Sequence, residues 1–253
     1  MPIQSLEMSS LSTLGKTNLF NIFLMIAVIG DIHGCFYSLK ELIEKVKSKY
    51  PGIQIYCVGD LIDRGNYSFD VLEFIMAEKI RFTPGNHDYM FYYFVNFPSS
   101  EMGTSWLYNG YETTISSYEN KFDKIASHLD FILEAPLFMN LNDCFISHAG
   151  ISNYYKSIFP ANFKDNLAVI ENYVSKDITE RHGILWTRGE LLNIGKLQVV
   201  GHTRHDEVFY NKKCNTLYID TSVYTGNKLS AVVVGDNKLV DIISVPTNPN
   251  DLN

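Results

Sequence analysis

The sequence has no excess of basic residues. It carries 21 Lys and Arg against 28 Asp and Glu, which gives a net charge of −7 at pH 7. Tight non-specific binding to nucleic acid depends on Lys and Arg at the phosphates. A nucleic-acid duplex is therefore not an expected partner, and any phosphate recognition by this chain has to be local.

The sequence also lacks a long apolar run. The apolar run near its start, residues 19–29, covers 11 residues, whereas a membrane-spanning helix needs about 20. Only Lys16 precedes this run as a basic residue, and no small-residue cleavage site follows before residue 30, so a secretory signal is not indicated. We expect no membrane association, and we interpret residues 1–21 as a flexible leader.

Cysteine is scarce, and no C-x-x-C pair is present among the four cysteines. Cys57 and Cys144 lie in apolar, strand-like runs, which favours buried thiols. Free thiols are typical of a reducing, cytoplasmic setting. The hydrophobic share of 46% and the charged share of 19% indicate a globular chain. Without repeats or low-complexity tracts, we expect a single domain over residues 22–246 and a frayed tail over 247–253.

One motif lies between an apolar run, residues 22–29, and an amphipathic stretch, residues 36–49. It reads Gly30-Asp31-Ile32-His33-Gly34. The flanking patterns predict a buried strand and a helix, so an Asp and a His stand at the carboxyl end of a strand, where α/β sheets bind ligands. A carboxylate and an imidazole suit a divalent metal. On this motif alone, a capped helix with an incidental His is the alternative.

Two further motifs repeat this arrangement. The first contains Asp60 and Asp63 in Gly-Asp-Leu-Ile-Asp-Arg-Gly, after the apolar residues 53–58, and the second contains Asn86 in Gly-Asn-His-Asp, after residues 80–83. Spacings of 29 residues from Asp31 to Asp60 and 26 from Asp60 to Asn86 each fit one strand-loop-helix-loop unit of a parallel sheet. We therefore expect these side chains to meet along one sheet edge.

Two single histidines follow in the second half of the chain. His148 comes after a short predicted strand, residues 143–147, and His202 after residues 198–201. From there the chain is rich in predicted strands and indicates a second sheet packed on the first. The strands are expected at residues 208–210, 216–220, 229–235 and 239–244.

The five motifs together resemble the calcineurin-like metallophosphoesterases and, within them, the bacterial-type phosphoprotein phosphatases. The signature of that family is GDxHG, GDxxDRG and GNHD or GNHE, followed by two separate histidines, and this chain matches it over about residues 26–203. The resemblance implies an α/β fold (α+β by some schemes) with two packed mixed β-sheets flanked by helices, a four-layer αββα sandwich.

The resemblance also implies two divalent metal ions, with Mn favoured and Fe, Zn or Co compatible. Asp31 and His33 would bind the first metal and Asp60 would bridge. The second metal would be held by Asn86, His148 and His202. A shared carboxylate offsets part of the repulsion between two cations that together activate a nucleophile and clamp phosphoryl oxygens.

The same resemblance assigns the remaining site residues. His87 would protonate the leaving oxygen, Asp63 would orient His87, and Arg64 would grip the substrate phosphate together with Arg188. The alternatives are a core histidine for His87 and a surface charge for Arg188. Other histidines have no matching partners: we interpret His128 and His182 as surface or structural residues and assign no role to His205.

Two insertions, about residues 89–140 and 151–185, are expected to cover the site and shape specificity. The aromatic run 89–94 favours core packing. Residues 106–113 look similar to a W-x-x-N-G-G-x-x-T segment of bacterial members, with Tyr111 in place of the second glycine. Residues 220–229 resemble D-T-G-x-x-x-G-G-x-L, with Ser222 and Asn227 replacing glycines.

The resemblance implies a phosphomonoester hydrolase, in first place a protein serine/threonine phosphatase whose dinuclear metal centre activates a hydroxide for direct attack on phosphorus. The substrate would be a phosphoprotein or a phosphorylated small molecule or nucleotide. The first alternative is a bis(5'-nucleosyl)-tetraphosphate hydrolase, and the second is a non-catalytic metal-binding scaffold. A nuclease is disfavoured by the acidic balance of the chain.

Overall fold

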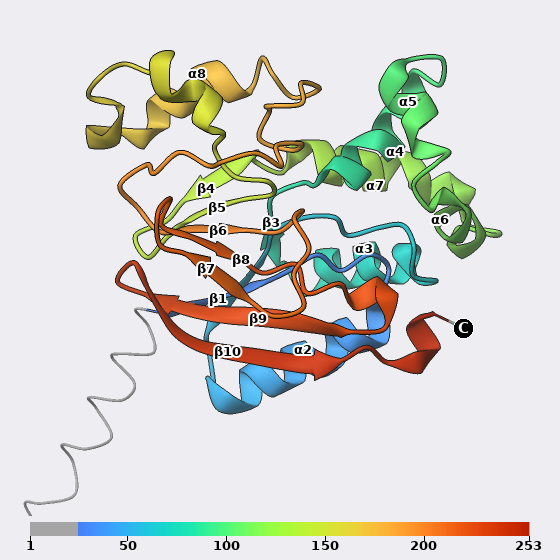
Figure 1. Cartoon of the computed structure of the whole chain (residues 1–253). Helices are drawn as coiled ribbons and strands as arrows, with labels where there is room; N and C mark the ends of the chain where they lie inside the picture. Colours follow the sequence, from blue (N-terminus) through green and yellow to red (C-terminus); the bar gives the residue numbers. More distant parts are fainter. Residues whose placement is uncertain (1–24, 253) are drawn as a thin grey trace, which may run out of the picture.

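Two five-stranded β-sheets lie face to face in the computed structural model, which describes residues 25–252 (Figure 1). The expected leader, residues 1–21, and the first three residues of the expected first strand lie outside the described residues. The prediction of two packed mixed sheets flanked by helices is confirmed. The core between the sheets contains Val28 of the first sheet, Val58 just after its strand over residues 54–57, and Ile146 and Val199 of the second sheet.

The first sheet has the order β10-β9-β1-β2-β3. Its strands are β1 (Met25–Ile29), β2 (Gln54–Cys57), β3 (Arg81–Phe82), β9 (Lys228–Gly235) and β10 (Lys238–Pro246). β1, β2 and β3 run parallel, whereas β9 pairs antiparallel with both β1 and β10. Parallel neighbours need a crossover, and the helices α2 (Phe36–Lys49) and α3 (Ser68–Ala77) supply it.

The second sheet has the order β4-β5-β6-β8-β7. Its strands are β4 (Phe138–Asn140), β5 (Phe145–Ser147), β6 (Gln198–Val200), β7 (Phe209–Asn211) and β8 (Thr216–Tyr218). β5, β6 and β8 are parallel, and the edge strands β4 and β7 are antiparallel to their neighbours. The parallel strands of each sheet therefore deliver their carboxyl-end loops in a common direction.

The first insertion folds into helices. They are α4 (Asn86–Asn96), α5 (Glu101–Trp106), α6 (Tyr111–Ser117), the short 3-10 helix η1 (Phe122–Lys124) and α7 (Ile125–Glu134). Tyr89 and Phe91 of the aromatic run are buried, and Phe91 stacks on Trp106 with ring centroids 5.0 Å apart. The core-packing interpretation of that run is confirmed for these residues.

The second insertion consists of short turns of helix. They are η2 (Asn153–Ser157), η3 (Phe163–Asp165), η4 (Leu167–Ile170) and α8 (Glu171–Val174). Their apolar side chains form a small core of their own that includes Phe145 of β5. In Figure 1, α5 and α8 stand on opposite sides above the sheets.

The end of the chain is tied to the first helix. Residues 249–251 form the 3-10 helix η6 (Pro249–Asp251), and the Asp251 side chain is fully buried. Its carboxylate accepts hydrogen bonds from the backbone N–H groups of Tyr37 (2.8 Å) and Ser38 (2.9 Å) in the first turn of α2. A frayed tail, as expected from the sequence, would lack these contacts.

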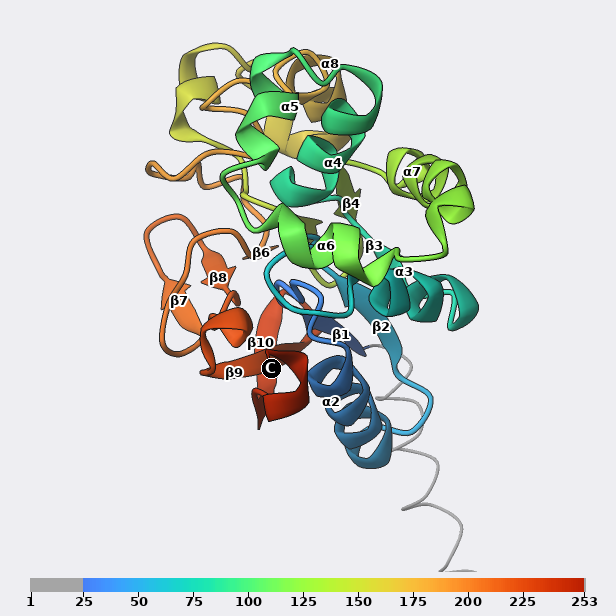
Figure 2. The same ribbon diagram turned by 90° about the vertical axis from the view of Figure 1, so that its right-hand side faces the viewer.

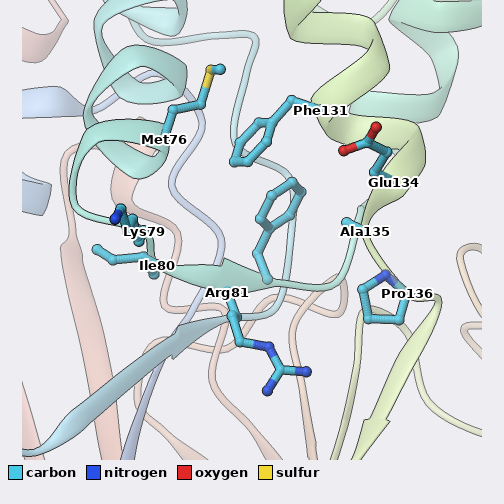
Figure 3. A pocket seen from close by; sticks show the side chains of 9 residues that line it. Met76, Lys79, Ile80, Arg81, Phe131, Glu134, Ala135 and Pro136 are labelled. Atoms are coloured by element: carbon cyan, nitrogen blue, oxygen red, sulfur yellow. The ribbon is translucent and has the colours of Figure 1, made fainter.

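Three further features bear on the sequence-based expectations. All four cysteines are buried free thiols. None of the helices within residues 25–252 combines the length and the apolar character needed to cross a bilayer. A cavity of about 360 Å³ opens at the edge strand β3, where Met76 of α3 faces Phe131 of α7 (Figure 3). No site residue predicted from the sequence lines this cavity.

Candidate metal centre

The loops that follow the strands of both sheets bring the predicted site residues together. Figure 2 looks onto the loops that follow β1 and β2. Several residues in the loops of both sheets have left-handed backbone, including His33 (φ 46°), Asp60 (φ 48°) and His202 (φ 62°). Such conformations are unfavourable for residues with a side chain and cluster at functional sites. The fold therefore holds these side chains in a backbone geometry that they would not adopt by themselves.

Two glycines allow the loops to approach one another. A Cβ atom on Gly201 would lie 1.8 Å from Asp31 Oδ1, and one on Gly85 would lie 2.1 Å from Asp60 Oδ1. Any side chain at either position would displace a carboxylate of the site.

Asp60 lies at the centre of the cluster. Its Oδ2 is 3.5 Å from His33 Nε2, and its Oδ1 is 3.5 Å from His148 Nε2. Possible ligand atoms form two groups around it, one with His33 and His87 and one with His148 and His202, and the atoms of each group lie within 4.8 Å of one another. The two oxygens of one carboxylate thus face two separate groups of donors.

Backbone carbonyls fix the tautomers of three histidines. Nδ1 of His33 is 3.0 Å from the Ile62 carbonyl, and Nδ1 of His148 is 2.9 Å from that of Val58. For His202 it is Nε2 that lies near a carbonyl, that of Trp186, at 3.2 Å. The nitrogen that faces a carbonyl carries the proton, so the other nitrogen of each ring presents a lone pair to the centre.

The lone pair of His148 faces oxygen acceptors rather than a hydrogen-bond donor. His148 Nε2 lies 3.0 Å from Asn86 Oδ1, besides its approach to Asp60. Burial lowers the pKa of His148, as it does for His33 and His202, so the rings are neutral and ready to act as ligands. A bound cation would accept these electron pairs and remove the repulsion between them. The donor set therefore fits divalent metal ions.

Asp31 adds negative charge to the same place. The backbone N–H of His202 donates to its Oδ2 at 3.0 Å. Burial raises the pKa of Asp31, and repulsion from Asp220 and Asp60 raises it further. Asp220 is itself buried, and burial raises its pKa to about 6. Buried carboxylates this close together require positive charge to remain ionised, which is a second indication of cations.

The predicted pair of His87 and Asp63 is formed. His87 Nδ1 lies 2.7 Å from Asp63 Oδ2, and both side chains are buried. Oδ2 also accepts the indole N–H of Trp106 at 2.8 Å, and Oδ1 accepts the hydroxyl of Thr114 at 2.7 Å. Burial raises the pKa of Asp63, while the hydrogen bonds from His87, Thr114 and Trp106 act to lower it.

The sequence did not identify Trp106 and Thr114 as supports of this pair. Trp106 begins the similar segment, and the nine-residue pattern W-x-x-N-G-G-x-x-T places its final Thr on Thr114, one residue beyond the stretch 106–113. A Trp followed eight residues later by Thr is the signal that could have found them.

Arginine side chains surround the centre. Arg64 Nη1 donates to His33 Nε2 at 2.9 Å, and its guanidinium carbon lies 4.2 Å from the centroid of the Tyr224 ring. Arg188 is exposed, but its Nη1 donates to the backbone carbonyl of His202 at 2.9 Å, which fixes it beside a predicted ligand. Arg204, which the sequence analysis did not identify, donates to the Tyr224 hydroxyl at 2.7 Å.

The remaining histidines lie apart from the two donor groups. His128 is buried between the Tyr118 hydroxyl (2.5 Å) and Glu73 (2.9 Å), which is a structural role, as interpreted from the sequence. His182 packs on Tyr154 with ring centroids 3.8 Å apart. His205 is the only one of the three next to Arg188, where both line a small cavity.

The two departures from the family pattern lie in the loop between β8 and β9. Ser222 adopts the left-handed conformation (φ 60°, ψ 44°) that a glycine would take more easily, and its N–H donates to Asp220 Oδ1 at 2.9 Å. Asn227 donates from Nδ2 to the carbonyls of Asp206 (3.0 Å) and Thr221 (2.9 Å). Ser222 therefore adds backbone strain, and Asn227 adds side-chain hydrogen bonds across the loop.

Comparisons with known proteins agree with this geometry. A profile described as calcineurin-like phosphoesterase matches residues 24–237. The chain is 28% identical over 246 residues, 87% of its length and 93% of the relative's, to bis(5'-nucleosyl)-tetraphosphatase PrpE (asymmetrical) of Anoxybacillus flavithermus. It is also 28% identical over 242 residues to the Bacillus subtilis protein of the same name, with 87% and 94% of the two chains covered. Among solved structures, a cold-active protein-tyrosine phosphatase of a psychrophilic Shewanella has a TM-score of 0.60 at 17% identity, with 88% of this chain and 80% of that one covered.

Proposed function

The chain belongs to the calcineurin-like phosphoesterase family, and from this premise we propose that it is a metal-dependent hydrolase of dinucleoside tetraphosphates. The observation that carries the proposal is the series of arginines beside the metal centre. Arg64 and Arg204 both contact Tyr224, and Arg204 and Arg188 line one cavity. One phosphate group needs one or two such side chains, whereas a chain of four phosphates can engage all three. The names of the relatives that match most of the chain support the same substrate class.

The proposed metal ligands are those expected from the sequence. Asp31, His33 and Asp60 would hold one cation, and Asp60, Asn86, His148 and His202 the other. The two oxygens of Asp60, each facing a different donor group, support its place as the shared ligand. Two bound cations supply activation of a water molecule and neutralisation of charge on the phosphoryl oxygens.

His87 is the proposed proton donor. Its Nδ1 is engaged by Asp63, so Nε2 is the atom that delivers a proton to the leaving oxygen. Asp63 holds the His87 ring in one orientation through this contact. Trp106 and Thr114 hold Asp63 in place through its two oxygens.

Two other functions expected from the sequence, a non-catalytic scaffold and a protein serine/threonine phosphatase, concern the same centre. The non-catalytic scaffold has less support, because two groups of possible metal ligands and the His87–Asp63 contact are both present. The protein serine/threonine phosphatase stays a prediction, since similarity to protein phosphatase structures at 17% identity concerns the fold alone.

The test is a pair of specificity constants measured on one Mn-loaded preparation. We expect kcat/KM for diadenosine tetraphosphate to exceed that for a phosphothreonine peptide by at least about tenfold, which corresponds to about 1.4 kcal/mol of transition-state stabilisation. The reverse preference would favour the phosphoprotein phosphatase. Absence of turnover on both substrates, with two metal equivalents bound, would return the scaffold as the better explanation.

A further inference from the structure

Two cavities share a wall beside the proposed metal centre. One has a volume of about 150 Å³ and the other about 490 Å³, and Arg188, Thr203 and His205 line both. Thr203 follows the proposed ligand His202 in the chain, and Ala149, which lines the smaller cavity, follows His148. A group seated in either cavity therefore lies next to the reaction site.

The smaller cavity has aromatic walls. The His205 ring lies 4.9 Å from the Phe209 ring and 5.4 Å from the Tyr218 ring, measured between centroids. Phe209 and Tyr218 are partners across β7 and β8, and these strands lie to one side of the loops after β1 and β2 in Figure 2. Tyr218 is buried, whereas Phe209 leaves 45% of its surface exposed on the edge strand. Phe209 therefore offers exposed aromatic surface beside the cavity.

The larger cavity is polar and carries positive charge. Arg188 and Arg204 line it together with Ser222 and Asn227, while Asp206 supplies the one acidic side chain. Arg204 is oriented by its hydrogen bond to Tyr224, whose ring also contacts His33 with centroids 4.9 Å apart. The two arginines thus continue the phosphate-binding surface away from the centre.

We propose that the cavity formed by His205, Phe209 and Tyr218 is a nucleobase subsite, and that Arg204 binds phosphates of the same substrate. This inference rests on the proposed function and names the part of the chain that selects nucleotides. Aromatic side chains stack on any base, because every base has a π-face. In a nucleotide, the base and the phosphates are joined through the ribose. This matches the aromatic cavity and the arginine-lined polar cavity, which share Arg188.

The neutral state of His205 fits this arrangement. Burial lowers the pKa of His205, although the Asp206 carboxylate acts to raise it. An uncharged imidazole packed against two aromatic rings extends the aromatic wall, while the positive charge of the region is carried by the arginines.

The experiment compares two ligands that differ only in the base. Binding of AMP and of ribose 5-phosphate to the Mn-loaded protein is measured by titration calorimetry, for the unmodified chain and for Phe209→Ala. We expect AMP to bind about 5- to 150-fold more tightly than ribose 5-phosphate, the range for stacking of one base on an aromatic residue. Phe209→Ala should remove most of that ratio while leaving the Kd of ribose 5-phosphate within about twofold.

Tyr210→Ala is the matched control. Tyr210 neighbours Phe209 on the same strand and is similarly exposed, at 47%, but does not line the cavity. Its substitution should leave both Kd values unchanged. Arg204→Gln should weaken ATP, which has more phosphates, more than AMP.

The outcomes separate this inference from the proposed function. Equal binding of AMP and ribose 5-phosphate by the unmodified chain overturns the nucleobase subsite, even if diadenosine tetraphosphate is hydrolysed. An equal loss in Phe209→Ala and Tyr210→Ala overturns it as well. A base-dependent ratio that Phe209→Ala abolishes supports the subsite, even if the peptide turns out to be the better substrate and the proposed function fails.

Discussion

Replacing Trp106 with Phe removes one hydrogen bond from the His87–Asp63 pair and little else. The indole N–H donates to Asp63 Oδ2 at 2.8 Å, and the ring stacks on Phe91 and lies 4.8 Å from the Phe94 ring. A phenyl ring keeps much of this packing but has no donor. Asp63 Oδ2 then keeps its contact with His87 Nδ1 but accepts one hydrogen bond fewer.

The size of the effect follows from the nature of the bond. Hydrogen bonds to charged groups contribute about 1.5–3 kcal/mol. If that energy acts fully in the transition state, kcat falls by about 10- to 150-fold. Because His87 and Thr114 still donate to Asp63, we expect a loss near the lower limit, about tenfold. KM should change less than twofold, since Trp106 contacts no proposed phosphate ligand.

Tyr155→Phe provides the control. This buried aromatic residue of the second insertion also loses a hydrogen bond to a carboxylate, from its hydroxyl to Asp177 Oδ2 at 2.8 Å. The assay is steady-state hydrolysis by the Mn-loaded enzyme, with metal content measured for each variant. The reasoning is wrong if Trp106→Phe keeps more than half of the unmodified kcat, or if Tyr155→Phe loses as much kcat as Trp106→Phe.

Three further predictions concern catalysis and stability. His87→Asn should lower kcat by about 100- to 10,000-fold, the usual range for loss of an acid–base group, with metal content unchanged; survival of activity would exclude His87 as the proton donor. Asp251→Ala should lower the free energy of unfolding by about 1–3 kcal/mol, because two N–H groups and the Ser38 hydroxyl at the start of α2 lose their acceptor; urea unfolding measures this, and an unchanged midpoint would show that the tail does not stabilise α2. Burial lowers the pKa of His128 in the folded protein. As pH falls through about 6.5, His128 of the unfolded chain therefore takes up a proton first, and the free energy of unfolding decreases. His128→Gln should flatten this decrease between pH 8 and 5.5, and equal slopes in the two proteins would contradict this.

The arrangement of the centre could be predicted from the sequence because each ligand stands beside an apolar run. Asp31 lies two residues after β1 and Asp60 three residues after β2, and parallel strands deliver such residues to one edge. The expected strand over residues 208–210 appears as β7 over 209–211, a shift of one residue at an exposed edge.

The supports of the centre could not be predicted in this way. The acceptors for His33, His148 and His202 are backbone carbonyls, which have no side-chain identity that a sequence could reveal. Arg204 and Phe209 likewise belong to no motif, and their positions beside the centre depend on the course of the chain around β7. The buried Asp251 was missed because a polar, proline-containing end is typical of frayed segments.

The proposed ligands come from both sheets, with Asp31 and Asp60 after strands of the first, and His148 and His202 after strands of the second. The spacing between donors is therefore set by the thickness of the apolar layer between the sheets. Val58 belongs to that layer and also offers its carbonyl to His148. Substitutions at such interior positions can alter activity without touching a ligand. Natural sequences should accordingly vary less at positions between the sheets than at positions on the helix-covered outer faces.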